Sequence, residues 1–137
     1  MREILFRAKR KDNGEWVEGS LVKIEENCFR IATQEDVAYA YPDKTTYAAW
    51  MYDVCEDTIC QYTGIKDKNG NKIFEGDIVK DIYTNKGYVM QVEWNDYYCG
   101  FEPFCLCDNY GEKLYLERNE DCIIVGNVFD NQEIKVV

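Results

Sequence analysis

Apolar and polar residues alternate with a period of two along the first third of the chain. The alternation covers residues 4–9, and the turn-forming sequence Asp12-Asn13-Gly14 follows it. An extended pattern resumes over Trp16–Ile24, and a second turn at Glu25-Glu26-Asn27 leads into Cys28–Thr33. Short turns between three alternating segments predict an antiparallel β meander.

The same period continues in the second half of the chain. Tyr88, Met90, Val92 and Trp94 share one face of the clearest predicted strand, and we expect Trp94 and Phe101 to be core residues. The further strand candidates are Ile78–Tyr83, Phe101–Cys107, Lys113–Glu117 and Cys122–Phe129. The last of them is apolar on both faces, which is typical of a central strand. Several short strands separated by tight turns predict a small barrel, because closing a sheet removes its exposed edges.

These patterns predict a mainly β protein in two parts. The N-terminal region spans residues 1–60 and the barrel domain spans 61–137, with a hinge near Asp57–Asn71. The meander is expected to pack on the barrel. The tyrosine-rich segment 39–52 is consistent with an extra strand pair or with a short helical turn, and its pattern does not separate the two.

The segment Gln61–Lys80, QYTGIKDKNGNKIFEGDIVK, has the composition of a series of turns. Its Asn-Gly pair favours a turn with positive φ, and an Asp after Gly can accept backbone N–H groups. We therefore assign a structural role to nine residues of this segment and of the later sequence VGN: Gly64, Asp67, Asn69, Gly70, Glu75, Gly76, Asp77, Gly126 and Asn127.

This segment, together with REILFRAKRKDNGEW before it and VGNVFDN after it, resembles the YopX family of bacteriophage and prophage proteins. The resemblance covers nearly the whole chain. It implies a phage or prophage origin, the cytoplasm of a bacterial host, and an SH3-like β-barrel in the C-terminal half. The resemblance does not point to a reaction, a cofactor or a catalytic residue. The tyrosine-rich segment and most of the cysteines lie outside the recognised pattern.

Composition narrows the possible partners. The chain is 46% apolar with a formal net charge of -10, and no apolar run approaches the length of about 20 residues that crosses a bilayer. We expect a soluble, cytoplasmic protein without a membrane partner. The net charge disfavours nucleic acid as a partner. Two nucleic-acid alternatives stay open, namely contact through the basic residues Arg7, Lys9, Arg10 and Lys11, and acidic mimicry of DNA.

Enzymatic chemistry has little support in the sequence. The chain has no His, which is the commonest general base and metal ligand, and it lacks the usual nucleophile and phosphate-binding motifs. Its 7 cysteines include no CxxC pair, so we expect free thiols and neither a metal nor a cofactor. A carboxylate-based hydrolase using Asp67, Glu75 and Asp77 is the second alternative, and capping of turns is the simpler role for these acids.

A binding function fits the sequence better. Aromatic side chains are common at protein interfaces, and many of them are grouped around one predicted hairpin. The candidate binding residues are Trp94, Tyr97, Tyr98, Phe101 and Tyr110. Tyr97 and Tyr98 follow the turn residues Asn95-Asp96, so we expect them to be exposed. The resulting hypothesis is a non-enzymatic accessory protein that binds an unknown protein or associates with itself.

Overall fold

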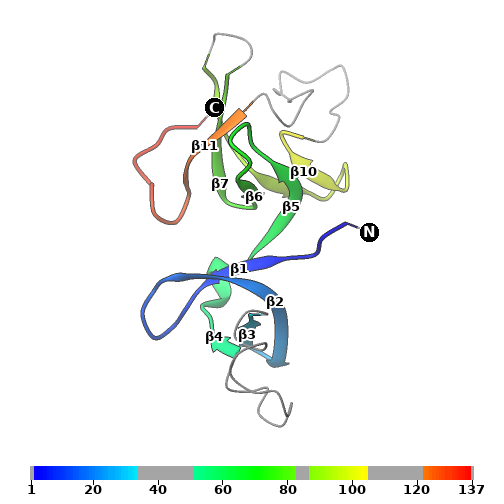
Figure 1. Cartoon of the computed structure of the whole chain (residues 1–137), viewed down its shortest axis with the longest axis vertical. Coiled ribbons are helices and arrows are strands. Elements are labelled where there is room, and N and C mark those ends of the chain that lie inside the picture. Colours follow the sequence, from blue (N-terminus) through cyan, green and yellow to red (C-terminus); the bar gives the residue numbers. More distant parts are fainter. Residues whose placement is uncertain (1, 34–50, 83–86, 105–121, 137) are drawn as a thin grey trace. The chain divides into compact units, whose positions relative to one another are not determined.

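The computed structural model describes residues 2–33, 51–82, 87–104 and 122–136. The chain divides into two compact units, Met1–Gln61 and Tyr62–Val137. The elements of the first unit are β1 (Phe6–Lys9), β2 (Trp16–Glu25), β3 (Cys28–Ala32), β4 (Met51–Asp53) and the 3-10 helix η2 (Glu56–Thr58), and β5 (Cys60–Lys66) begins there (Figure 1). The second unit continues β5 and contains β6 (Lys72–Phe74), β7 (Asp77–Asp81), β8 (Val89–Gln91), β9 (Glu93–Asn95), β10 (Gly100–Glu102) and β11 (Cys122–Asn127). The protein is mainly β.

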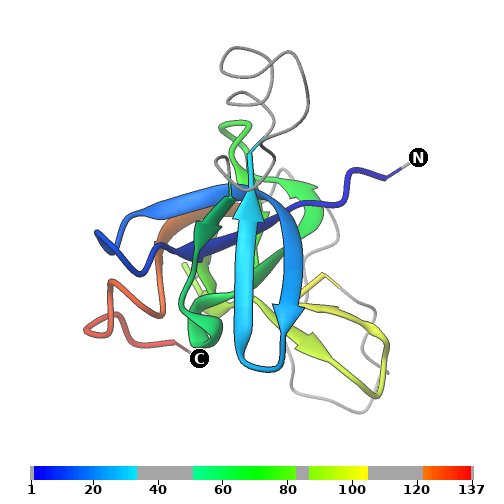
Figure 2. The same ribbon diagram turned by 90° about the horizontal axis from the view of Figure 1, so that it is seen from below.

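The first unit contains the predicted meander. Strands β1, β2 and β3 pair antiparallel in chain order, and β4 pairs with the outer edge of β3. Figure 2 shows β2 and β3 side by side as a long hairpin. Its turn depends on Asn27, which has a φ of 63°, and Asn is one of the few residues with a side chain that adopts this region readily. The core of the unit is formed by Ala8, Ile31 and Val54, all of which are buried.

The second unit is built around β7. This strand pairs antiparallel with β11 on one side and with β8 on the other. Elsewhere in the unit, the later residues of β5 pair with β6, and β9 pairs with β10. Within the described ranges these strands form open antiparallel sheets, and no closed barrel is found. The core consists of Ile73, Val79, Met90, Val92 and Cys122.

The position of the last strand differs from the prediction. In the described part of the chain, β11 pairs only with β7, so β7 and not β11 is the central strand. Cys122 is fully buried, but Val125 on the same strand is 38% exposed. Although β11 is apolar on both faces, it is therefore an edge strand of the described sheet and is only partly buried. The predicted strand Lys113–Glu117 lies outside the described residues.

The predicted strand from Tyr88 to Trp94 is interrupted at Val92. The Val92 N–H donates to the carbonyl oxygen of Asp77 at 2.8 Å, and the Val92 carbonyl accepts from the Gly76 N–H at 2.8 Å. The chain then leaves β7, and the next residues pair with β10 instead. Met90 and Val92 are buried, but Trp94, on the same predicted face, is 46% exposed. The assignment of Trp94 to the core is therefore wrong.

Asp67 joins two parts of the second unit that are distant in sequence. Its carboxylate accepts hydrogen bonds from the backbone N–H groups of Asn69 and Asn71, both at 2.9 Å, inside its own turn. It also accepts from the N–H of Ile124 in β11, at 3.1 Å. Burial alone would raise the pKa of Asp67, but these hydrogen bonds, led by the one from Ile124, lower it below its ordinary value. The side chain is thus a buried, ionised clamp between the turn and β11.

Asp77 performs a similar function at the start of β7. Its Oδ2 accepts the Phe74 N–H at 2.8 Å, and the residue is only 2% exposed. Gly76, directly before it, has a φ of 81°, a conformation that side chains rarely allow. The sharp turn between β6 and β7 therefore needs a glycine and an acceptor side chain in succession.

The sequence VGN closes the C-terminal end of β11. The Oδ1 of Asn131 accepts the Asn127 N–H at 3.1 Å, while the Oδ1 of Asn127 accepts the N–H groups of Phe129 and Asp130. Gly126 lies against this turn. A Cβ at position 126 would lie 2.6 Å from the Asn131 Oδ1, so the glycine is required for space.

We expect Asp67→Asn to lower the free energy of unfolding by roughly 1–3 kcal/mol at neutral pH, because an amide nitrogen would face one of the bound N–H groups. The folded pKa of Asp67 is lowered, so its stabilising contribution is complete above the unfolded pKa of about 3.9 and is lost as the pH falls through the folded value. The difference in stability between wild type and variant should therefore shrink at acidic pH. Urea unfolding followed by tryptophan fluorescence measures both effects.

Asp57→Asn is the matched control for this experiment, because Asp57 is exposed. Its unfolding curve should overlay that of the wild type at each pH. Equal stability of the Asp67→Asn variant and the wild type at neutral pH would contradict the clamp.

We expect Gly126→Ala to destabilise the protein by about 1–3 kcal/mol, the usual cost of overpacking. The new methyl group would displace the Asn131 side chain and break its bond to the Asn127 N–H. Thermal unfolding of the single variants and of the Gly126→Ala/Asn131→Ala double variant measures the coupling. The glycine substitution should cost less when Asn131 is already alanine. Strictly additive costs would show that this contact is not the cause.

Candidate interaction surface

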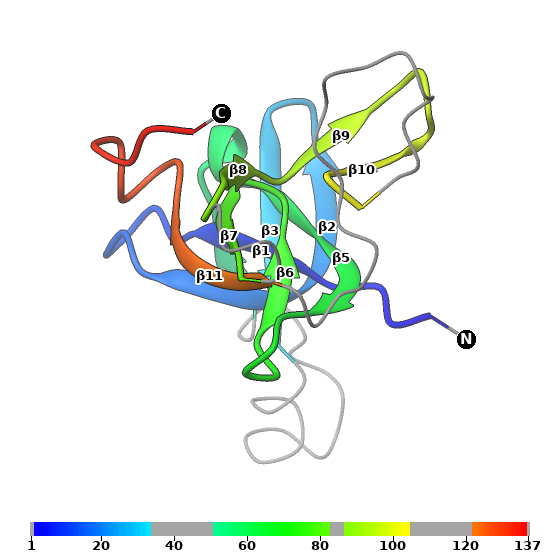
Figure 3. The same cartoon turned by 90° about the horizontal axis from the view of Figure 1, so that it is seen from above.

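The candidate site is the β9–β10 hairpin, residues 93–102, which we call the aromatic hairpin. Its strands pair antiparallel, with Trp94 opposite Phe101 and Asn95 opposite Gly100. Figure 3 shows the hairpin extending away from β7 and β8 of the same unit. It begins directly after Val92, the last residue of this segment that is hydrogen-bonded to the turn before β7.

The tip of the aromatic hairpin is ordered by one asparagine. The Oδ1 of Asn95 accepts the N–H groups of Tyr97, at 2.9 Å, and Tyr98, at 3.1 Å. Its Nδ2 donates to the Glu102 carboxylate at 2.7 Å. Cys99 completes the tip with a φ of 51°. The backbone that presents both tyrosines is therefore fixed by side-chain hydrogen bonds.

The aromatic rings of the hairpin form two pairs. Trp94 and Phe101 meet edge to face with centroids 5.1 Å apart, and Tyr97 and Tyr98 do so at 4.9 Å. The Trp94 indole N–H donates to Asp96 at 2.8 Å, which fixes the orientation of the indole. Tyr97 is 84% exposed, while Tyr98 and Phe101 are half-buried. Two anchored aromatic side chains, Trp94 and Tyr97, thus face solvent.

The structure places four of the five candidate binding residues on this hairpin, and Tyr110 lies outside the described residues. Phe101 is half-buried and also packs against the core of the unit. The roles of Asn95 and Asp96 in ordering the site were not predicted from the sequence. The signal was present, because Asn and Asp often bind backbone groups a few residues later in a turn.

Three of the four basic residues considered for nucleic-acid contact, Arg7, Lys9 and Arg10, lie against aromatic rings of the first unit. The guanidinium of Arg7 lies 4.7 Å from the centroid of the Trp16 ring, and the Lys9 ammonium lies 5.4 Å from the same centroid. Arg10 lies over the Tyr52 ring at 4.1 Å. These cations therefore already form cation–π contacts within their own unit.

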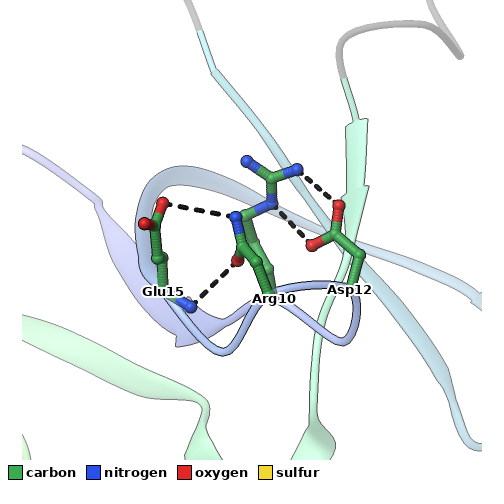
Figure 4. Close-up of polar contacts among 4 residues, drawn as sticks. Arg10, Asp12 and Glu15 are labelled. Atoms are coloured by element: carbon green, nitrogen blue, oxygen red, sulfur yellow. Dashed lines mark hydrogen bonds and ion pairs between the residues drawn. The ribbon is translucent and has the colours of Figure 1, made fainter.

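Arg10 also forms a forked ion pair with Asp12 (Figure 4). Its Nε donates to the Asp12 Oδ1 at 2.9 Å, and its Nη2 bonds to the second oxygen. The hydrogen bonds raise the pKa of Arg10 and lower the pKa of Asp12. The Arg10 N–H donates to the Glu15 carbonyl at 2.9 Å, which closes the turn between β1 and β2.

Two of the three candidate catalytic carboxylates, Asp67 and Asp77, are hydrogen-bonded within the fold. Asp67 and Asp77 both use their carboxylates to bind backbone N–H groups, as described above. Over the part of the chain that is described, no group of three Cys, Asp or Glu side chains is placed to hold a metal ion. An aspartate with a lowered pKa and several N–H donors is a weak base, so this arrangement favours structure over catalysis.

The cysteines of the described ranges are free thiols. Cys60 and Cys122 are buried, Cys28 and Cys55 are half-buried, and Cys99 is exposed at the hairpin tip. Cys105 and Cys107 lie outside these ranges.

No helix within the described ranges has both the length and the apolar character needed to cross a membrane.

Comparisons with known proteins give a family and a fold. Among solved structures, the chain is similar to the crystal structure of protein EF1440 from Enterococcus faecalis. The two are 19% identical with a TM-score of 0.53, and the match covers 97% of this chain and 98% of that one. No curated protein matches the chain. The family described as YopX protein matches residues 5–134, nearly the whole length. The chain belongs to the YopX protein family.

Proposed function

We propose that this YopX family protein is a non-enzymatic interaction module of a phage or prophage, and that it acts in the cytoplasm of the bacterial host. Its contact surface is the aromatic hairpin. The observation that carries the proposal is the exposure of Tyr97, at 84%, and Trp94, at 46%, on a backbone held by Asn95. The phage origin and the cytoplasm rest on the motif resemblance.

Exposed aromatic residues on a fixed backbone are well suited to binding. Tyr and Trp bring a large contact area and lose little side-chain entropy, because each has only two rotatable angles. Here Asp96 already restrains the Trp94 indole, and the edge contact with Tyr98 restrains Tyr97. Side chains that are ordered before binding cost less to immobilise in a complex. The occupant of the surface is another protein or a second copy of this chain.

The SH3-like arrangement of the C-terminal unit is part of this proposal. Its support is the central position of β7, which pairs antiparallel with both β8 and β11. Small domains of this kind bind peptides at aromatic residues on their surface. The aromatic hairpin supplies such residues.

The other two hypotheses have less support. Contact with nucleic acid would use Arg7, Lys9, Arg10 and Lys11. The first three of these cations stack on rings within the first unit, and the net charge of the chain is -10. Acidic mimicry of DNA rests on that charge alone. A carboxylate-based hydrolase would need Asp67, Glu75 and Asp77, and the oxygens of both aspartates accept backbone hydrogen bonds.

We expect the double variant Tyr97→Ala/Tyr98→Ala to lose most of its binding to any partner recovered from lysate of the phage-carrying host. Truncating two aromatic anchors usually weakens a complex by at least about tenfold. Quantitative pull-down with tagged protein measures the loss, and circular dichroism checks that the variant is folded.

Ile24→Ala is the matched control, because Ile24 is 46% exposed in the first unit and lies outside the hairpin. Light scattering of the wild type and the double variant shows whether the surface binds a second copy of the chain or a different protein. A dimer that dissociates on substitution assigns the surface to a second copy. Recovery of every partner by a folded double variant would refute the hairpin as the contact surface.

A further inference from the structure

We infer that the aromatic hairpin recognises an arginine-containing, positively charged segment of another protein. This inference rests on the proposed interaction function and adds the chemistry of the partner. It is carried by the charge around the exposed rings and by the way the chain pairs its own cations with aromatic side chains.

The sequence of the hairpin is acidic. The segment Tyr88–Phe104 contains three carboxylates, Glu93, Asp96 and Glu102, and it has neither Lys nor Arg. Glu93 and Asp96 are exposed beside Trp94 and Tyr97. The faces of aromatic rings carry partial negative charge. Rings and carboxylates therefore combine into a surface that attracts cations.

Asp96 reinforces the attraction at Trp94. Its carboxylate accepts the indole N–H at 2.8 Å, so a negative charge is fixed at the edge of the ring that binds cations best. A cation stacked on the indole would interact with the ring and with the carboxylate at once. The planar guanidinium of arginine suits both interactions better than a lysine ammonium, because it stacks and is more weakly hydrated.

The first unit contains an arginine that contacts an aromatic ring and a carboxylate at once. The Arg10 guanidinium stacks on the Tyr52 ring at 4.1 Å and forks onto the Asp12 carboxylate. The cations that stack on rings in the described ranges lie on Trp16, Phe29, Tyr52 and Tyr62. None of them lies on Trp94 or Tyr97. The hairpin thus presents the ring and the carboxylate, and the partner supplies the guanidinium.

Charge also argues against two other occupants. A symmetric contact between two hairpins would bring Glu93 and Asp96 close to their copies, and like charges in a contact are unfavourable. Nucleic acid would bring phosphates to the same carboxylates. A basic segment of a different protein is the occupant that gains from every charged group on the surface.

The test is a titration of the full-length, nitrogen-15-labelled protein with a blocked peptide of alternating Gly and Arg containing three arginines. We expect the indole N–H signal of Trp94 and the amide signals of Tyr97 and Tyr98 to shift. A peptide with citrulline, a neutral isostere of arginine, should bind at least about tenfold more weakly, and added salt should weaken the arginine peptide.

Two variants locate the interaction. Tyr97→Ala should weaken the arginine peptide about two- to fivefold, as expected for an exposed cation–π contact. Asp96→Asn keeps an oxygen for the indole N–H and removes the charge, so it should cost roughly threefold. Glu18→Gln is the charge-matched control on an exposed site of β2, and it should leave the affinity unchanged.

The inference is overturned by equal affinity for the arginine and citrulline peptides, by shifts confined to residues outside the hairpin, or by no shift at millimolar peptide. Broadening of the hairpin signals with protein concentration alone would assign the surface to a second copy. If the double tyrosine variant loses its partner while neither peptide binds, the interaction surface stands and only the arginine chemistry fails. If the arginine peptide binds the hairpin but the double variant keeps its partners, the hairpin binds arginine but is not the surface that those partners contact.

Discussion

The second unit depends on one buried charge, the carboxylate of Asp67. It is 5% exposed, and it binds backbone N–H groups of its own turn and of Ile124, which is 57 residues later in the chain. A buried carboxylate is tolerated only when its oxygens are satisfied. The turn between β5 and β6 and the strand β11 must therefore be in place together. This requirement explains the Asn-Gly turn chemistry around Asp67 without invoking a reaction.

The turn before β7 sets the position of the aromatic hairpin. Gly76 and Asp77 both bond to the backbone of Val92, which is fully buried in the core. The residues after Val92 are released from β7 and pair with β10. The turn at Gly76 and Asp77 thus determines that the buried part of this segment ends at Val92. Trp94 lies two residues later. The fold and the proposed contact surface are connected through this backbone pairing.

The sequence predicted local features better than distant ones. Asp12-Asn13-Gly14 and Asn27 mark turns by their composition alone, and the meander follows from them. Period two placed Met90, Val92 and Trp94 on one face. Met90 and Val92 are buried and Trp94 is exposed, because a period tells which face a residue occupies and not where the strand ends. The exposure of Val125 and the bond from Ile124 to Asp67 depend on contacts between distant segments, which no local pattern encodes. Exposure was predicted for both Tyr97 and Tyr98 from the turn residues before them. It is correct for Tyr97, whereas Tyr98 is half-buried.

Stability does not account for the aromatic residues at the hairpin tip. Trp16 and Tyr52 stack against cations of their own unit, and Tyr62 and Phe74 pack together at 5.5 Å, so these rings contribute to the fold. Tyr97 is 84% exposed and buries little surface, so its removal should cost the fold little. Asn95 and Asp96 nevertheless hold the tip and the Trp94 indole in fixed positions. Ordering side chains that stay exposed costs conformational entropy, and little burial offsets this cost in the folded protein. A complex formed at this surface would benefit, because side chains that are already ordered lose less entropy on binding.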